Sequence, residues 1–116
     1  MNTNNKKNIV IKIGTTSIIK NDKVDITLLK SLAELIIENK NHFNFVIVTS
    51  GAVGLGATKL NYKSRPKSLK RLQVASAVGQ IELINQYEKI FKEKNLHIAQ
   101  VLITKNLIDD REQFVN

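Results

Sequence analysis

One stretch of this chain decides its fold, and it reads Val46-Ile47-Val48-Thr49-Ser50-Gly51-Ala52-Val53-Gly54-Leu55-Gly56. A β-branched apolar run leads into two hydroxyl side chains and a glycine-rich turn, and an apolar run bounded by turn residues is typical of a buried strand. The same chemistry occurs earlier, in Ile9-Val10-Ile11-Lys12-Ile13-Gly14-Thr15-Thr16. In open α/β sheets, ligands bind just beyond the carboxyl ends of the strands. The two strand ends therefore predict a site for phosphate and a small polar substrate.

Length and composition fit one globular domain, or part of one. The chain has 116 residues, of which 42% are hydrophobic and 24% charged, so a packed core is expected rather than global disorder. The chain has no cysteine, which excludes disulfides and thiolate metal sites and is compatible with a reducing cytoplasm. Because the sequence shows neither a signal peptide nor a run long enough to span a bilayer, we expect a cytoplasmic protein without a membrane partner.

The formal net charge of +8 raises the question of a nucleic acid or phosphate partner. Lysine, asparagine and isoleucine are all abundant, so a general compositional bias with solvated surface lysines explains most of the excess. Aromatic residues are sparse, which argues against a platform for stacked bases. One basic cluster stands out, and it admits two interpretations, a solvated loop or a contact to a nucleotide or anionic substrate. It surrounds Pro66 and comprises Lys59, Lys63, Arg65, Lys67, Lys70 and Arg71.

Hydrophobic periodicity predicts an α/β fold with an open, mainly parallel sheet and helices on both faces. Asp25 is expected to begin one helix as its N-cap, Ser68 is expected to start another, and Gly79 is expected to mark a close helix contact. The expected elements are a strand at 8–14, a loop at 15–24, a helix at 25–40, a strand at 43–49, a helix at 52–60, a polar connection at 61–66, a helix at 68–94, a strand at 97–103 and a helix start at 109–116.

The pattern also predicts how much of a domain is present. Residues 1–7 are polar and expected to be disordered, and no linker or internal repeat divides the remainder. The chain stops inside its last expected helix, where Phe114 and Val115 would make the first core contacts. We therefore expect residues 1–116 to be a fragment of a single domain rather than a complete one.

Several residues at the two strand ends are candidates for binding chemistry. Lys12 lies in an apolar strand, and burying an unpaired ammonium is costly, which favours an anionic partner. Strand alternation places Lys12 opposite Ile11 and Ile13, so a lysine that faces solvent is the alternative. Gly14 and Gly51 can offer backbone N–H groups to an anion, or can be ordinary turn glycines. The hydroxyls of Thr15, Thr16, Thr49 and Ser50 can bind a carboxylate or phosphate, or can cap the following helix.

Taken together, these segments resemble the glutamate 5-kinases of the amino acid kinase superfamily. The resemblance runs from about residue 8 to the last residue, and the turn at Thr49 to Ala52 together with the later Ala-Val-Gly-Gln sequence distinguishes this family within the superfamily. The segments that carry it, in this order, are Val10 to Thr15, Val46 to Val53, Ala75 to Gln80, Leu102 to Thr104 and Asp109 to Arg111.

The resemblance implies a stacked αβα fold in which ATP, with Mg²⁺ held through its phosphates, phosphorylates the γ-carboxylate of L-glutamate in proline biosynthesis. Lys12 matches the lysine that contacts the transferring phosphoryl group. Gly14, Thr15 and Gly51 match the phosphate-binding positions, and no residue of this chain is expected to bind a metal directly. The glutamate-binding turn is matched by Ser50, Gly51 and Ala52.

The family pattern continues past Asn116, so the resemblance implies that residues 1–116 are the N-terminal, substrate-side portion of a single amino acid kinase domain. We therefore expect the fragment alone to be inactive. For the complete protein, the resemblance also implies a homo-oligomer and raises feedback inhibition by proline. Two alternatives stay open: another superfamily member, such as a uridylate or acetylglutamate kinase, or a basic, non-catalytic α/β module that binds nucleic acid.

Overall fold

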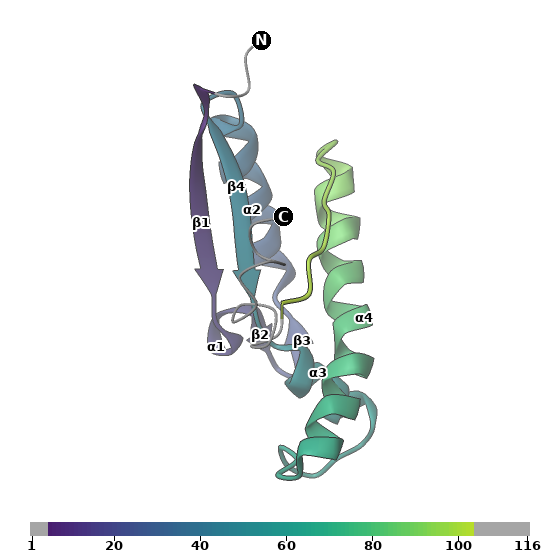
Figure 1. Ribbon diagram of the computed structural model, residues 1–116. Coiled ribbons are helices and arrows are strands. Elements are labelled where there is room, and N and C mark those ends of the chain that lie inside the picture. The colour runs from purple at the N-terminus through teal and green to yellow at the C-terminus, as the bar shows by residue number, and fades with distance from the viewer. Residues whose placement is uncertain (1–4, 104–116) are drawn as a thin grey trace, which may run out of the picture.

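A two-stranded parallel sheet forms the framework of the molecule. The computed structural model describes residues 5–103 of the chain. Figure 1 shows the elements in space, and in chain order they are β1 (Lys7–Ile13), α1 (Thr15–Ile18), β2 (Ile19–Lys20), β3 (Lys23–Val24), α2 (Ile26–Asn39), β4 (Phe43–Thr49), α3 (Ala52–Lys59) and α4 (Leu69–Glu93). The pairing of β1 with β4 runs from Lys7 opposite Phe43 to Ile13 opposite Thr49. Both strands therefore end side by side, as the sequence predicts.

The two faces of this sheet differ in their cover. On one face, Ile11, Phe45 and Ile47 pack against a core built largely from α2 and α4, which lie on the same side of the sheet in Figure 1. On the other face, Val10 and Val48 are 64% and 50% exposed. Within residues 5–103 the parallel sheet and its helices are confirmed. The expected helices on both faces are not seen among these residues, since burial alternates along β1 and β4 and only one face is covered.

The helices begin where their capping residues predict. The Asp25 carboxylate accepts a hydrogen bond from the Leu28 N–H at 3.2 Å, and α2 starts at the next residue after Asp25. The Ser68 hydroxyl accepts a hydrogen bond from the Arg71 N–H at 3.3 Å, and the 25-residue helix α4 starts at the residue after Ser68. Each cap satisfies an N–H group that has no partner within the helix.

Helices α3 and α4 approach one another closely at two glycines. A Cβ atom on Gly79 would lie 1.8 Å from the Ala52 carbonyl oxygen, and one on Gly56 would lie 1.7 Å from that of Ala75. Side chains larger than hydrogen are therefore excluded at both positions, which confirms the expectation for Gly79. This contact fixes the start of α3 against the middle of α4.

The segment expected to be a loop at 15–24 contains regular structure instead. It forms the single-turn helix α1 and a tight antiparallel hairpin in which Ile19 pairs with Val24. Asn21 and Asp22 both have positive φ, 53° and 62°, as a two-residue hairpin turn of the favoured hand requires. The prediction of a turn at these two residues was correct, but strands of two residues are too short to show a periodic pattern.

The strand expected at 97–103 is wrong. No strand forms after α4 within the described residues, and Figure 1 shows the chain running back along that helix. Leu96 and Ile98 pack against the core, while Val101 and Leu102 are 75% and 70% exposed. An apolar segment becomes a strand only when a neighbouring strand pairs with its backbone, and neither β1 nor β4 does so here.

At the ends of the chain, only part of what the sequence predicts falls within the described residues. β1 already begins at Lys7, inside the stretch expected to be disordered. The helix start expected at 109–116 lies outside the described residues, as do residues 1–4. Among residues 5–103, no helix combines the length and the apolar character needed to cross a membrane.

Candidate functional site

Ser50 joins the two strand ends. Its hydroxyl donates to the Ile13 carbonyl at 3.3 Å and accepts from the Thr15 hydroxyl at 3.1 Å, and its N–H donates to the same Ile13 carbonyl at 3.2 Å. The hydroxyl-bearing turns after β1 and β4 therefore form one polar surface. This is the juxtaposition that the sequence predicts from the parallel order of the strands.

Gly51 turns the chain from β4 into α3. Its φ of +110° is a left-handed conformation that favours glycine, and a Cβ there would also come within 3.2 Å of the side chains of Ile18 and Ile19. Gly51 is the N-cap of α3 and no side chain caps the first turn of this helix. The alternative role of Thr49 and Ser50 as caps of this helix is therefore wrong. The first N–H groups of a helix carry partial positive charge and suit an anion.

Tyr87 holds the end of β4 against α4. Its hydroxyl donates to the Thr49 hydroxyl at 2.9 Å, and its ring packs edge-to-face against Phe91. Burial raises the pKa of the Tyr87 phenol above its usual value of 10.0, and the hydrogen bond with Thr49 offsets part of that effect. The phenol is therefore neutral at physiological pH and acts as a fixed hydrogen-bond donor beneath the site.

A cavity of about 260 Å³ opens at these strand ends. Three of its residues come from later segments and were not among the predicted site residues, namely Arg65, Ser76 and Gln80. Ser76 and Gln80 are four apart and share one face of α4. Both belong to the segment Ala75 to Gln80 that carries the family resemblance, and Arg65 belongs to the basic cluster, so the sequence held a signal for each. The full lining is Thr15, Thr49, Ser50, Gly51, Ala52, Val53, Gly54, Arg65, Ser76 and Gln80.

Four of the six predicted site residues line this cavity, namely Thr15, Ser50, Gly51 and Ala52. Lys12 and Gly14 are not among its lining residues. Lys12 is exposed and lies on the open face of β1, opposite the buried Ile13 side, so in this structure it is not an ammonium buried in an apolar strand. The solvent-facing orientation that strand alternation allows is the one observed.

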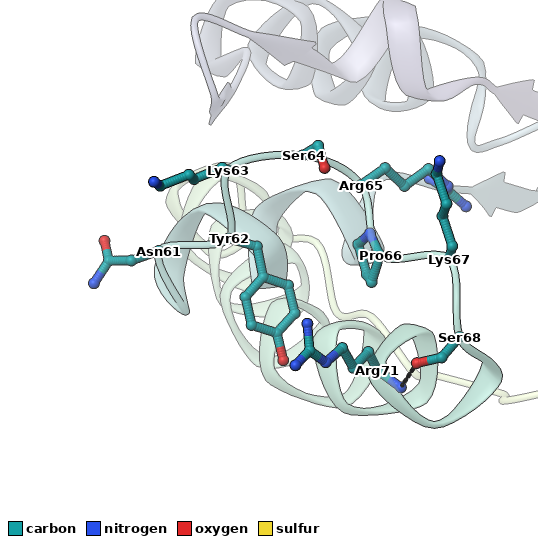
Figure 2. A pocket seen from close by; sticks show the side chains of 9 residues that line it. All are labelled: Asn61, Tyr62, Lys63, Ser64, Arg65, Pro66, Lys67, Ser68 and Arg71. Carbon is teal, nitrogen blue, oxygen red and sulfur yellow. Dashed lines mark hydrogen bonds between the residues drawn. The ribbon is translucent and has the colours of Figure 1, made fainter.

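A larger cavity of about 610 Å³ lies along the polar connection between α3 and α4. Figure 2 shows the Arg71 side chain beside the Tyr62 ring, while Lys63 points away from the loop. The Arg71 guanidinium carbon lies 5.7 Å from the centre of that ring, within range of a cation–π contact. This cavity is built from one exposed loop and the start of α4, whereas the smaller cavity gathers both strand ends, α3 and α4. The smaller cavity is therefore the candidate site.

The model of the amino acid kinase family matches residues 7–116, which is nearly the whole chain. The chain belongs to the amino acid kinase family.

Relatives within the family agree on one activity in their names. The chain is 45% identical to a glutamate 5-kinase of Prochlorococcus marinus subsp. pastoris, over 95% of this chain and 31% of that protein. It is 38% identical to a glutamate 5-kinase of Haemophilus influenzae, over 97% of this chain and again 31% of that protein. The chain thus spans about a third of the length of the curated relatives it matches.

Proposed function

We propose that this chain forms the substrate-side part of a glutamate 5-kinase, which transfers the γ-phosphoryl group of ATP to the γ-carboxylate of L-glutamate in proline biosynthesis. The observation that carries the proposal is the joining of both glycine and hydroxyl turns into one small cavity through Ser50. The names of the relatives supply the reaction class. A cavity of about 260 Å³ is below the usual range for drug-sized ligands and suits an amino acid.

The described residues have chemistry that suits this reaction. A carboxylate is ionised at neutral pH, so it can attack phosphorus without a general base. Phosphoryl transfer depends mainly on positioning and on neutralising charge on the transferring oxygens. We assign the glutamate-binding turn to Ser50, Gly51 and Ala52, and the phosphate-facing backbone to Gly14, Thr15 and Gly51. Lys12, which lies on β1 two residues before Gly14, is assigned the role of neutralising negative charge on the transferring phosphoryl group.

Mg²⁺ would enter this reaction with the nucleotide. Within residues 5–103, no three His, Cys, Asp or Glu side chains gather where they could hold a metal ion. Mg²⁺ is commonly held by the phosphates of its nucleotide and few protein ligands, and it neutralises phosphate charge there. The first-turn N–H groups of α3 and the hydroxyls of Thr15 and Ser50 are neutral donors that suit phosphate or carboxylate oxygens. Inhibition by proline and a homo-oligomeric state stay predictions.

The test is a product assay on the complete protein that contains residues 1–116, because these residues alone are expected to be inactive. With ATP, Mg²⁺ and L-glutamate, γ-glutamyl phosphate is trapped by hydroxylamine as the γ-glutamyl hydroxamate. We expect product from the wild type, a turnover about 10²–10³-fold lower in Lys12→Ala, and a raised KM for glutamate in Ser50→Ala. Absence of hydroxamate from the wild type would refute the proposal, and phosphorylation of UMP or N-acetylglutamate instead would move the protein to another branch of the family.

A further inference from the structure

Arg65 is the charged residue of the candidate site. Among the described residues that line the cavity of about 260 Å³, the others are hydroxyl, amide, glycine or aliphatic side chains. Arg65 also lines the larger basic cavity, so it stands where the two meet. Any ligand that enters the smaller cavity therefore meets one full positive charge there.

The Arg65 guanidinium has no carboxylate partner among residues 5–103. The ion pairs of the described residues lie elsewhere, between Lys20 and Asp25 and between Lys94 and Glu34. A guanidinium offers a planar set of donors that matches a carboxylate in bidentate geometry. Its exposure leaves those donors available to a ligand.

The loop that carries Arg65 is anchored on both sides. Before it, the Tyr62 N–H donates to the Ala57 carbonyl at 2.8 Å, and the Tyr62 ring packs beside Arg71. After it, Pro66 is buried and Ser68 caps α4. These contacts hold the backbone of Arg65 next to the cavity, so that binding a ligand orders little more than one side chain.

We propose that Arg65 binds the α-carboxylate of the amino acid substrate and sets the preference of the site for a substrate that carries this second negative charge. The assignment rests on the proposed function, which places the reacting γ-carboxylate at the turn of Ser50 to Ala52. Because that turn and Arg65 come from different elements, the two ends of one small molecule can be held separately. Ser76 and Gln80 line the same cavity and add neutral hydrogen-bonding groups.

The test compares two ligands that differ at the α-carboxylate alone. L-Glutamate carries it, and L-isoglutamine replaces it with an amide while keeping the γ-carboxylate. Binding is measured by titration calorimetry on the complete protein that contains residues 1–116. Since a hydrogen bond to a charged group is worth more than a neutral one, we expect Arg65→Gln to weaken glutamate binding about 10-fold and leave isoglutamine binding unchanged. Arg65→Lys should retain part of the glutamate affinity that Arg65→Gln loses, because lysine keeps the positive charge but lacks the planar donor set of the guanidinium.

Lys67→Gln is the matched control. It removes the same charge two residues away, from a side chain that lines the larger cavity but not the smaller one, and it should leave both affinities unchanged. Three results would each overturn the assignment. Lys67→Gln could weaken glutamate binding as much as Arg65→Gln does, Arg65→Gln could weaken the binding of both ligands equally, or Arg65→Gln could leave glutamate affinity unchanged. If the wild type bound no glutamate, the proposed function would fail as well, and that result is distinct from the other three.

Discussion

The close contact between α3 and α4 makes a strong prediction for Gly79→Ala. The new Cβ would lie 1.8 Å from the Ala52 carbonyl oxygen and 2.6 Å from the Gly56 nitrogen, whereas real Cβ contacts are essentially never shorter than 3.0 Å. Both neighbours are backbone atoms, so no side-chain rotation can relieve the clash. The two helices must therefore separate by at least about 1 Å at this point.

Two opposing effects set the magnitude. Replacing glycine with alanine inside a helix stabilises it by about 1 kcal/mol, because the unfolded chain loses conformational freedom. Overpacking a rigid contact costs about 1–3 kcal/mol, and occasionally more. The clash here is with backbone on two sides, so we expect the upper part of that range and a net loss of about 2 kcal/mol in the free energy of unfolding. Because Ala52 follows the turn at Gly51, the site should be disturbed with it.

The assay is urea denaturation of the variant against the wild type, with Gly54→Ala as the control. Gly54 lies in α3, and a Cβ there meets no atom within 4 Å. The same chemical change should therefore be neutral or stabilising by up to about 1 kcal/mol at Gly54. A Gly79→Ala variant as stable as the wild type would show that the helices can separate without cost, and would refute the argument that this contact positions the site.

Two further predictions concern single contacts. Tyr87→Phe removes the hydroxyl bonded to Thr49 while keeping the ring against Phe91, and should lower the free energy of unfolding by about 0.5–1.5 kcal/mol in urea denaturation; no change would mean that water replaces this bond fully. The Lys20 ammonium, 3.1 Å from Asp25, is the main reason that the pKa of this carboxyl lies below 3.8, followed by the Leu28 N–H. The stability that this contact supplies is therefore present above about pH 4 and is lost as pH falls through the folded-state pKa. Lys20→Gln should accordingly reduce the drop in the thermal unfolding midpoint between pH 5 and pH 2. A drop as large as that of the wild type would contradict this prediction.

Much of the fold can be predicted from the sequence where local signals agree with one another. The strand at 43–49 is a continuous apolar run that ends in turn residues, and the helices after Asp25 and Ser68 begin with residues that cap them. Each of these elements is decided by its own residues, through periodicity and capping. The close contact at Gly79 was also predictable, because a glycine inside a helix destabilises it and usually has a packing or functional reason.

The segment at 97–103 shows where that reasoning stops. Its apolar residues are as typical of a strand as those of β1, yet the described structure gives it no strand partner. Pairing is a property of two segments, and one sequence window cannot report whether the second is in reach. The same limit explains Arg65, whose neighbours in sequence identify a basic loop but not the cavity that the loop borders.

Gly14 and Gly54 differ from Gly79 in a way that only the structure reveals. At Gly79 the protein's own backbone excludes a side chain, whereas a Cβ at Gly14 or Gly54 would meet no atom within 4 Å. Neither has the positive φ that would favour glycine for conformational reasons. Gly54 lines the candidate cavity, and Gly14 immediately precedes Thr15, which also lines it. A side chain at either position would occupy space beside the strand ends, and no packing contact among the described residues requires glycine there. We therefore propose that close approach of a ligand is the reason for glycine at these two positions.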